Sequence, residues 1–236
     1  MSDVAKTAEK SFSVQERVFC ALRKRIIDLT LRPGMVMSAN EVSEMMSVSR
    51  TPVREAFMRL EREGLVKIIP QRETIVSRID LQRVRQEQFL RESLELAVLE
   101  PFFRKCSREH LDKLRKMIQR QCESAERKDY VAVIDFDDTF HRLIFTIAEQ
   151  PLSWEIIESM SGHYRRCRLM TIWSDELKSD IMLQHETLVN AVQDGNFALC
   201  RQIMEKHLRK LFVEEEMLLS DYPDYFEVNE RDPFDI

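Results

Sequence analysis

Residues 49–56 read Ser-Arg-Thr-Pro-Val-Arg-Glu-Ala and predict the start of a helix with a cationic, exposed face. Ser49 or Thr51 can cap the helix N-terminus. Arg50 and Arg54 are four positions apart and therefore share one side of the helix. The apolar stripe lies on another side and comprises Val53, Ala56, Phe57 and Leu60. The pattern predicts a helix that packs by one face and offers arginines on the other.

The segments on either side of this helix complete a recognisable order. They are an amphipathic helix ending before Pro33-Gly34, a short helix at 40–46, a turn at 47–48, and two β-rich runs at 65–69 and 74–77. Helix, short helix, turn, helix and hairpin is the order of a winged helix-turn-helix. We therefore expect this fold at residues 13–78, preceded by a flexible tail at 1–12.

The rest of the chain predicts helices only. Six residues can cap helical runs of roughly 15–25 residues, namely Asp80, Ser107, Asp129, Ser153, Asp175 and Asn196. Short breaks between such runs favour an antiparallel all-α helical bundle, expected at residues 79–220, with an acidic, loose tail at 221–236. The predicted fold class is mostly α, with an N-terminal winged helix-turn-helix and a C-terminal bundle.

The charge of the chain is divided between these two parts. The formal net charge is −5, but residues 1–78 hold 14 lysines and arginines against 10 acidic residues. Residues 79–236 hold 22 against 31. The basic excess thus lies in the part that would have to face phosphates.

The composition also indicates where the protein works. No stretch reaches the roughly 20 apolar residues that span a bilayer, and residues 1–10 lack the apolar core of a secretory signal. The five cysteines are scattered without a Cys-x-x-Cys pair, so neither a disulfide framework nor a thiolate zinc site is expected. We expect a cytoplasmic, nucleoid-associated protein with no membrane partner.

The cationic helix has the chemistry of a DNA-reading element. The N-terminal end of a recognition helix enters the major groove, where it meets base edges and phosphates. Ser49, Arg50, Thr51 and Arg54 supply short polar and cationic side chains at that end. An arginine can bind guanine O6 and N7 together, and serine or threonine can bind phosphate oxygens. An ordinary solvated face is the alternative for the two arginines alone.

A second group of residues has the composition of a metal site. Asp137 and His141 are four apart on one predicted helix, so both point to one side. His185 and His207 lie on two later predicted helices. One carboxylate and three imidazoles can converge inside a bundle and suit zinc, nickel, iron, cobalt or manganese. Taken singly, each histidine is also compatible with a hydrogen-bonded core residue, and Asp138 is the reserve carboxylate.

The N-terminal part resembles a known family. Arg-Pro-Gly at 32–34, the stretch at 49–56, Glu-Gly-Leu-Val at 63–66 and Pro-Gln-Arg at 70–72 are similar to the DNA-binding domain of the GntR family of bacterial regulators. The resemblance implies that double-stranded operator DNA is a partner. It also implies principal DNA contacts from Arg50, Thr51 and Arg54 and a weaker one from Asn40. Ser49 and Arg72 are further candidates for DNA contacts. Glu73 departs from the family's usual glycine, which weakens the expectation of a conventional wing contact.

The C-terminal part resembles the FCD domain of the FadR subfamily of these regulators. The similarity rests on Asp-x-x-x-His at 137–141, His-Glu at 185–186, Asp-Gly at 194–195 and His-Leu at 207–208. It implies Asp137, His141, His185 and His207 as ligands of a divalent metal, with zinc expected first. It also implies a homodimer and a small carboxylate metabolite held near the metal. Candidates for binding that carboxylate are Arg91, Arg165 and Arg168.

Together these features predict a transcription regulator, with repression expected, whose affinity for its operator is controlled by the metabolite. A direct metal-ion sensor is the first alternative. A metal-dependent hydrolase is the second, because an open site of this kind can activate water and Glu186 could serve as a base. Nothing else in the sequence supports an enzyme.

Overall fold

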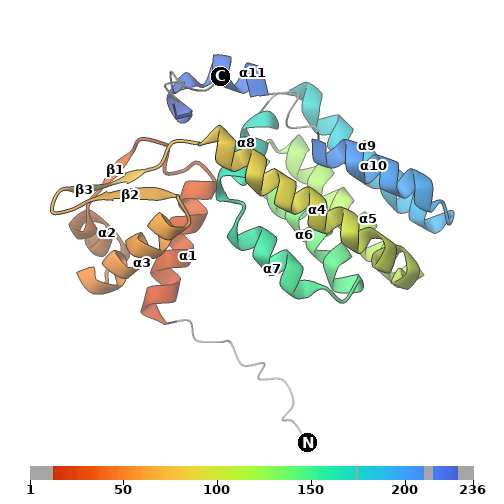
Figure 1. The fold of residues 1–236 in the computed structure, drawn as a ribbon, viewed down its shortest axis with the longest axis horizontal. Coiled ribbons are helices and arrows are strands. Elements are labelled where there is room, and N and C mark those ends of the chain that lie inside the picture. Colours follow the sequence, from red (N-terminus) through yellow and green to blue (C-terminus); the bar gives the residue numbers. More distant parts are fainter. Residues whose placement is uncertain (1–12, 174, 210–214, 228–236) are drawn as a thin grey trace, which may run out of the picture. The chain divides into compact units, whose positions relative to one another are not determined.

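The structure is a computed structural model that describes residues 13–173, 175–209 and 215–227. The chain divides into two compact units, one formed by Met1–Ile26 with Thr30–Ser77 and the other by Ile27–Leu29 with Arg78–Ile236. The first unit contains a small sheet and three helices, and the second contains helices (Figure 1). The predicted fold class is confirmed.

The first unit has the predicted order of elements. These elements are α1 (Val14–Ile27), β1 (Val36–Met37), α2 (Ala39–Met46), α3 (Arg50–Arg62), β2 (Val66–Ile69) and β3 (Glu73–Val76). The three strands pair antiparallel in the order β1-β3-β2. Strand β1 was not predicted, because two residues are too few to produce an alternating pattern.

Local capping places α3. Ser38 and Glu41 form a capping box at the start of α2, and Ser47 ends α2 in the left-handed conformation. The chain then turns directly into α3, whose N-cap is Ser49. Ser49 therefore occupies the capping position that the sequence predicted, but its side chain makes no capping hydrogen bond. The predicted apolar stripe is buried and comprises Val53, Ala56, Phe57 and Leu60.

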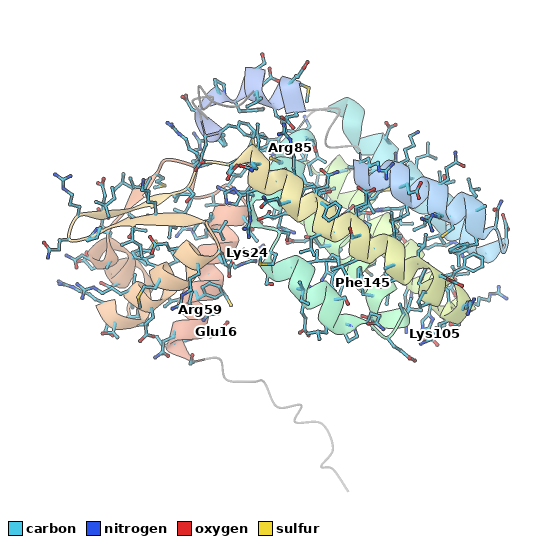
Figure 2. All side chains as sticks on the ribbon, in the orientation of Figure 1. Glu16, Lys24, Arg59, Arg85, Lys105 and Phe145 are labelled. Carbon is cyan, nitrogen blue, oxygen red and sulfur yellow. The ribbon has the colours of Figure 1, made fainter. Side chains whose placement is uncertain are left out.

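Two ion pairs fix α3 against α1. Arg59 Nη1 lies 2.7 Å from Glu16 Oε2, and Figure 2 shows these two side chains facing one another. Arg23 Nε lies 2.6 Å from Glu63 Oε2. The Arg59 guanidinium also stands 3.6 Å above the centre of the Phe19 ring. These contacts involve the last turns of α3. The N-terminal turn, with Arg50 and Arg54, is exposed.

The hairpin between β2 and β3 differs in detail from the expectation. The sequence predicted that the second strand begins at residue 74, but Glu73 is the first residue of β3 and pairs with Ile69. The residue in the left-handed region is Gln71, with φ of 59°. A side chain in that region costs roughly 1–2 kcal/mol, so the strain of this turn lies at Gln71.

We expect Gln71→Gly to stabilise the protein slightly and Gln71→Val to destabilise it. Glycine removes the steric cost of the left-handed backbone but adds chain entropy to the unfolded state, leaving a gain of about 0.5 kcal/mol. Valine is β-branched and fits this conformation worst, so a loss above about 1 kcal/mol is expected. Chemical denaturation followed by circular dichroism measures both. Equal stability of the two variants would contradict this assignment of strain.

The second unit contains eight helices within its described residues. They are α4 (Leu81–Lys105), α5 (Arg108–Glu126), α6 (Tyr130–Ile147), α7 (Pro151–Ser159), α8 (Gly162–Thr171), α9 (Asp175–Gln193), α10 (Phe197–Arg209) and α11 (Glu215–Asp221). Asp80, Ser107 and Asp129 are N-caps as predicted. The helix expected from Ser153 is instead two helices, which separate at Met160-Ser161 before Gly162.

One continuous apolar core positions the helices of this unit. Helices α4, α5, α6, α9 and α10 pack against one another, as Figure 1 shows. The largest apolar side chains of the core are fully buried and include Phe102, Phe140 and Phe145. Several charged and polar side chains also lie within this core. None of the helices within the described residues is long and apolar enough to cross a membrane.

The last described residues are not loose. Phe226 forms a parallel β-bridge with Ile79, the residue that precedes the N-cap of α4. The Ile79 amide donates to the Tyr225 carbonyl at 2.8 Å, and the Glu227 amide donates to the Ile79 carbonyl at 3.0 Å. Phe226 is buried in the core of the helical unit. The expectation of a loose tail from residue 221 is therefore wrong for 222–227, and residues 228–236 lie outside the described part.

Candidate metal centre and DNA-reading surface

Four predicted residues come together in the core of the helical unit. Asp137 and His141 lie one turn apart on α6, His185 lies on α9 and His207 on α10. One ligand atom from each of the four lies within 4.8 Å of those of the other three. Asp137, His141 and His185 are buried, and His207 is half-buried. The spacing of four on α6 brings two of these groups to one side, as the sequence indicated.

The three imidazole rings are held in one tautomer by acceptors behind them. His141 Nδ1 lies 2.5 Å from Glu95 Oε2, His185 Nδ1 lies 3.0 Å from Gln121 Oε1, and His207 Nδ1 lies 3.0 Å from Gln184 Oε1. Carboxylate and amide oxygens accept hydrogen bonds, so each Nδ1 donates its proton. Each neutral ring then presents the unprotonated Nε2 toward the other rings.

The Nε2 atoms consequently face one another and a carboxylate. His141 Nε2 lies 3.1 Å from His207 Nε2, and His185 Nε2 lies 3.5 Å from Asp137 Oδ1. His185 Nε2 is buried without a hydrogen-bond donor in the described part of the chain. Lone pairs that converge in this way repel one another unless a cation lies between them. Three neutral imidazoles and one carboxylate are a ligand set that divalent metals accept, so these residues fit a metal.

The electrostatics favour the protonation states that a metal needs. Burial lowers the pKa of His185 to about 3, although Asp137 opposes the shift. Burial and the other two histidines also hold the pKa of His207 well below its usual value. For Asp137, burial acts to raise the pKa, but the Arg168 guanidinium bound to it holds the pKa well below the usual carboxyl value. Neutral imidazoles and an ionised carboxylate are the metal-binding forms of these groups.

The three predicted arginines lie beside this cluster and surround Asp138. Arg168 donates to Asp138 Oδ1 at 2.7 Å and also binds Asp137. Arg165 binds the other oxygen of Asp138, and Arg91 Nη1 lies 3.6 Å from Asp138 Oδ1. The Arg91 side chain is buried. Asp138, considered as a reserve ligand, belongs to this arginine cluster and not to the group of four metal-ligand candidates.

The predicted DNA-contacting residues lie around one concavity of the first unit. This concavity has a volume of about 580 Å³ and lies between the starts of α2 and α3 and the β2–β3 hairpin. Its lining residues include Asn40, Arg50, Arg54 and Arg72. Ser49 and Thr51 are exposed at the start of α3 but do not line it. Three guanidinium groups therefore gather on one surface, which suits a polyanion.

Glu73 lines the same concavity and opposes that charge. We expect Glu73→Gln to raise the affinity for DNA because the substitution removes one negative charge from the surface that we expect to face phosphates. A single exposed charge is worth about 0.5–1 kcal/mol, which corresponds to a two- to fivefold change in Kd at low salt. The gain should shrink as salt rises. Fluorescence anisotropy with labelled DNA at two salt concentrations tests this, with Glu44→Gln on α2, outside the lining, as control.

Sequence reasoning missed the residues behind the histidines. Glu95, Gln121 and Gln184 are all buried polar side chains. A usable indication existed for Gln121, because it interrupts the apolar helical positions of Leu114 and Ile118 with a polar group. No comparable pattern singles out Glu95 or Gln184. Polar residues at core positions of a helix are informative because they need a partner there.

Comparisons with known proteins agree with both units. Residues 14–76 match the model of the bacterial regulatory proteins of the gntR family, and residues 88–210 match the model of the FCD domain. This chain belongs to the GntR family. The resemblance inferred from the motifs is thereby confirmed, and this GntR protein is a transcription regulator with a DNA-binding helix-turn-helix and an FCD ligand-binding domain.

Relatives and solved structures extend the match over most of the chain. This GntR regulator is 32% identical to an HTH-type transcriptional regulator in an unstable DNA locus of Streptomyces ambofaciens, over 89% of this chain and 88% of the relative. It is 30% identical to the transcriptional repressor RspR of Escherichia coli strain K12, over 90% and 93%. Its fold resembles that of E. coli McbR/YncC, with a TM-score of 0.72 at 20% identity over 86% and 99% of the two chains.

Proposed function

We propose that this protein is a repressor whose affinity for operator DNA is set by a small carboxylate metabolite bound at a divalent metal in the FCD domain. The observation that carries the proposal is the convergence of three imidazole Nε2 atoms and an ionised carboxylate beside three arginines. Repression is supported by the relatives, two of which are named as transcriptional repressors, one from E. coli and one from Bacillus licheniformis.

The metal would be held by Asp137, His141, His185 and His207. Its positive charge would attract a carboxylate oxygen of the metabolite. The donor set suits zinc, nickel, iron, cobalt or manganese, and zinc remains the first expectation. The chain's own contribution is to fix the orientation and the tautomer of the three imidazoles through their Nδ1 hydrogen bonds.

The arginine cluster would bind the remainder of the ligand's negative charge. Arg91, Arg165 and Arg168 share Asp138 in this structure. A carboxylate that enters the site competes with Asp138 for these guanidinium groups, since one cation cannot satisfy two anions equally well. Ligand binding would therefore loosen Asp138 from the cluster. The core of the FCD domain would then differ between the free and the bound protein.

We further infer a homodimer, because two-fold proteins read two-fold operators about one helical turn apart. A regulator of chromosomal genes works where the chromosome lies, in the cytoplasm at the nucleoid. Glu186, which could serve as the base of a hydrolase, is exposed on α9 and is not one of the four potential ligands. We therefore propose a regulator and not an enzyme.

Elemental analysis of the purified protein, paired with a thermal-shift screen of small carboxylic acids, tests the function. About one metal per chain, with some acids stabilising only the metal-loaded protein, is the expected result. If the metal binds weakly and changes the affinity for DNA without any added acid, the direct metal sensor is favoured. Protein that is free of metal and insensitive to every acid would overturn the proposal for the FCD domain and leave only the DNA-binding part.

A further inference from the structure

The Glu95 carboxylate contacts both the arginine cluster and the metal-ligand candidates. Its Oε1 accepts from Arg91 Nε at 2.6 Å, and its Oε2 accepts from His141 Nδ1 at 2.5 Å. The side chain is 1% exposed and lies in the middle of α4. Among the described residues, no other side chain forms hydrogen bonds both to an arginine of the cluster and to one of the three histidine rings.

The other two histidines have a different kind of partner. The Nδ1 atoms of His185 and His207 are bound by Gln121 and Gln184, which are neutral amides. A hydrogen bond to a carboxylate is shorter and stronger than one to an amide, and it draws the Nδ1 proton further from the ring. The ring then donates more strongly through Nε2, as in the carboxylate–histidine–metal arrangement. Of the three rings, His141 is therefore the one whose partner strengthens its Nε2 most as a metal ligand.

We propose that Glu95 is the positioning residue of this metal site, whose negative charge orients His141, strengthens it as a ligand and ties it to Arg91. The inference rests on the proposed metal function. It assigns a role to the charge of Glu95 and not only to its shape, because Gln121 and Gln184 already provide uncharged acceptors of similar geometry. It also explains why a carboxylate is tolerated in the core, where a buried anion without two strong donors would be costly.

Zinc affinity of metal-stripped, full-length protein, measured by competition with a coloured chelator, tests the role. Glu95→Gln keeps the shape and the acceptor oxygen but removes the charge. We expect zinc binding about 10- to 100-fold weaker. The control is Glu100→Gln, which removes a carboxylate from an exposed pair on the same helix. The control should bind zinc as the unchanged protein does. A Glu95→Gln protein that binds zinc within twofold of the unchanged protein would overturn the proposal.

A second variant works in the opposite direction. Gln184→Glu keeps an acceptor at His207 Nδ1 and gives this ring a charged partner, which only His141 has in the unchanged protein. Zinc should bind more tightly in this variant, by up to about tenfold. Unchanged or weaker binding in a folded Gln184→Glu protein would also overturn the role of charge, even if Glu95→Gln failed to fold.

Cobalt supplies an independent readout. The visible absorption bands of bound Co²⁺ respond to ligand strength, so they should shift in Glu95→Gln and stay unchanged in Glu100→Gln. If the unchanged protein binds neither zinc nor cobalt, the proposed metal function itself is wrong. If it binds both and all variants match it, only the role of Glu95 is wrong.

Discussion

Arg54→Ala is expected to remove sequence-specific DNA binding while leaving the helical unit and its metal content intact. Arg54 is exposed at the start of α3 and lines the concavity that also contains Arg50 and Arg72. One arginine bound to a guanine contributes roughly 1–3 kcal/mol of discrimination. A dimer would carry two copies, so Kd should rise by roughly two orders of magnitude or more. DNA selected by the unchanged protein from a random library is the probe, with binding measured by anisotropy.

The matched control for this experiment is Arg62→Ala. Arg62 is an exposed arginine in the last turn of the same helix and does not line the concavity. The Arg62→Ala substitution should weaken DNA binding no more than the loss of a single distant charge does, about two- to fivefold. Circular dichroism of both variants checks folding. If Arg54→Ala and Arg62→Ala bind the selected DNA equally well, α3 does not read DNA through its N-terminal end.

His207→Ala is expected to abolish tight metal binding and with it a large part of the thermal stability. A metal at 100 times its Kd stabilises a native protein by about 2.7 kcal/mol. For a chain of this size that corresponds to a melting temperature roughly 5–10 °C higher. The unchanged protein should therefore melt at a lower temperature after chelation, whereas His207→Ala should melt at the same temperature with or without the chelator. His207 is half-buried, so its removal leaves a smaller void than removal of His185.

His110→Gln separates loss of the ligand from loss of any histidine. His110 Nδ1 accepts from the Ser107 amide in a capping box at the start of α5, and glutamine can take the same place. This variant should keep both its metal and its response to chelation. Full metal content in His207→Ala would show that the set of ligands has been assigned incorrectly.

Much of the fold could be predicted because its strongest patterns are local. The stripe from Val53 to Leu60 and the spacing of Asp137 and His141 are visible within single helices. Caps such as Asp80 and Ser107 are short-range as well, and they marked where α4 and α5 begin. The meeting of His185 and His207 with α6 needed more than periodicity. Residue spacing left it open, and the resemblance to the FCD domain supplied it.

The parts that could not be predicted depend on contacts between distant segments. Glu95 and His141 are 46 residues apart, and nothing in either segment indicates the other. Gln71 adopts a positive φ because the register of β2 and β3 closes the hairpin at that residue, and the register is not visible in four-residue strands. The helices α7 and α8 separate at Met160-Ser161, where the backbone leaves the helical conformation, and this break was not anticipated from the helical run that the sequence predicts there.

The bridge between Ile79 and Phe226 sets where this protein can be cut into recombinant fragments. The matched family segments, 14–76 and 88–210, both omit this bridge. A fragment drawn to the FCD match would lack Phe226 and its partner strand residue, and would expose the apolar surface that Phe226 covers. A fragment for expressing the helical unit alone should therefore begin before Ile79 and end beyond Glu227. Affinity tags should be placed away from both ends of the bridge.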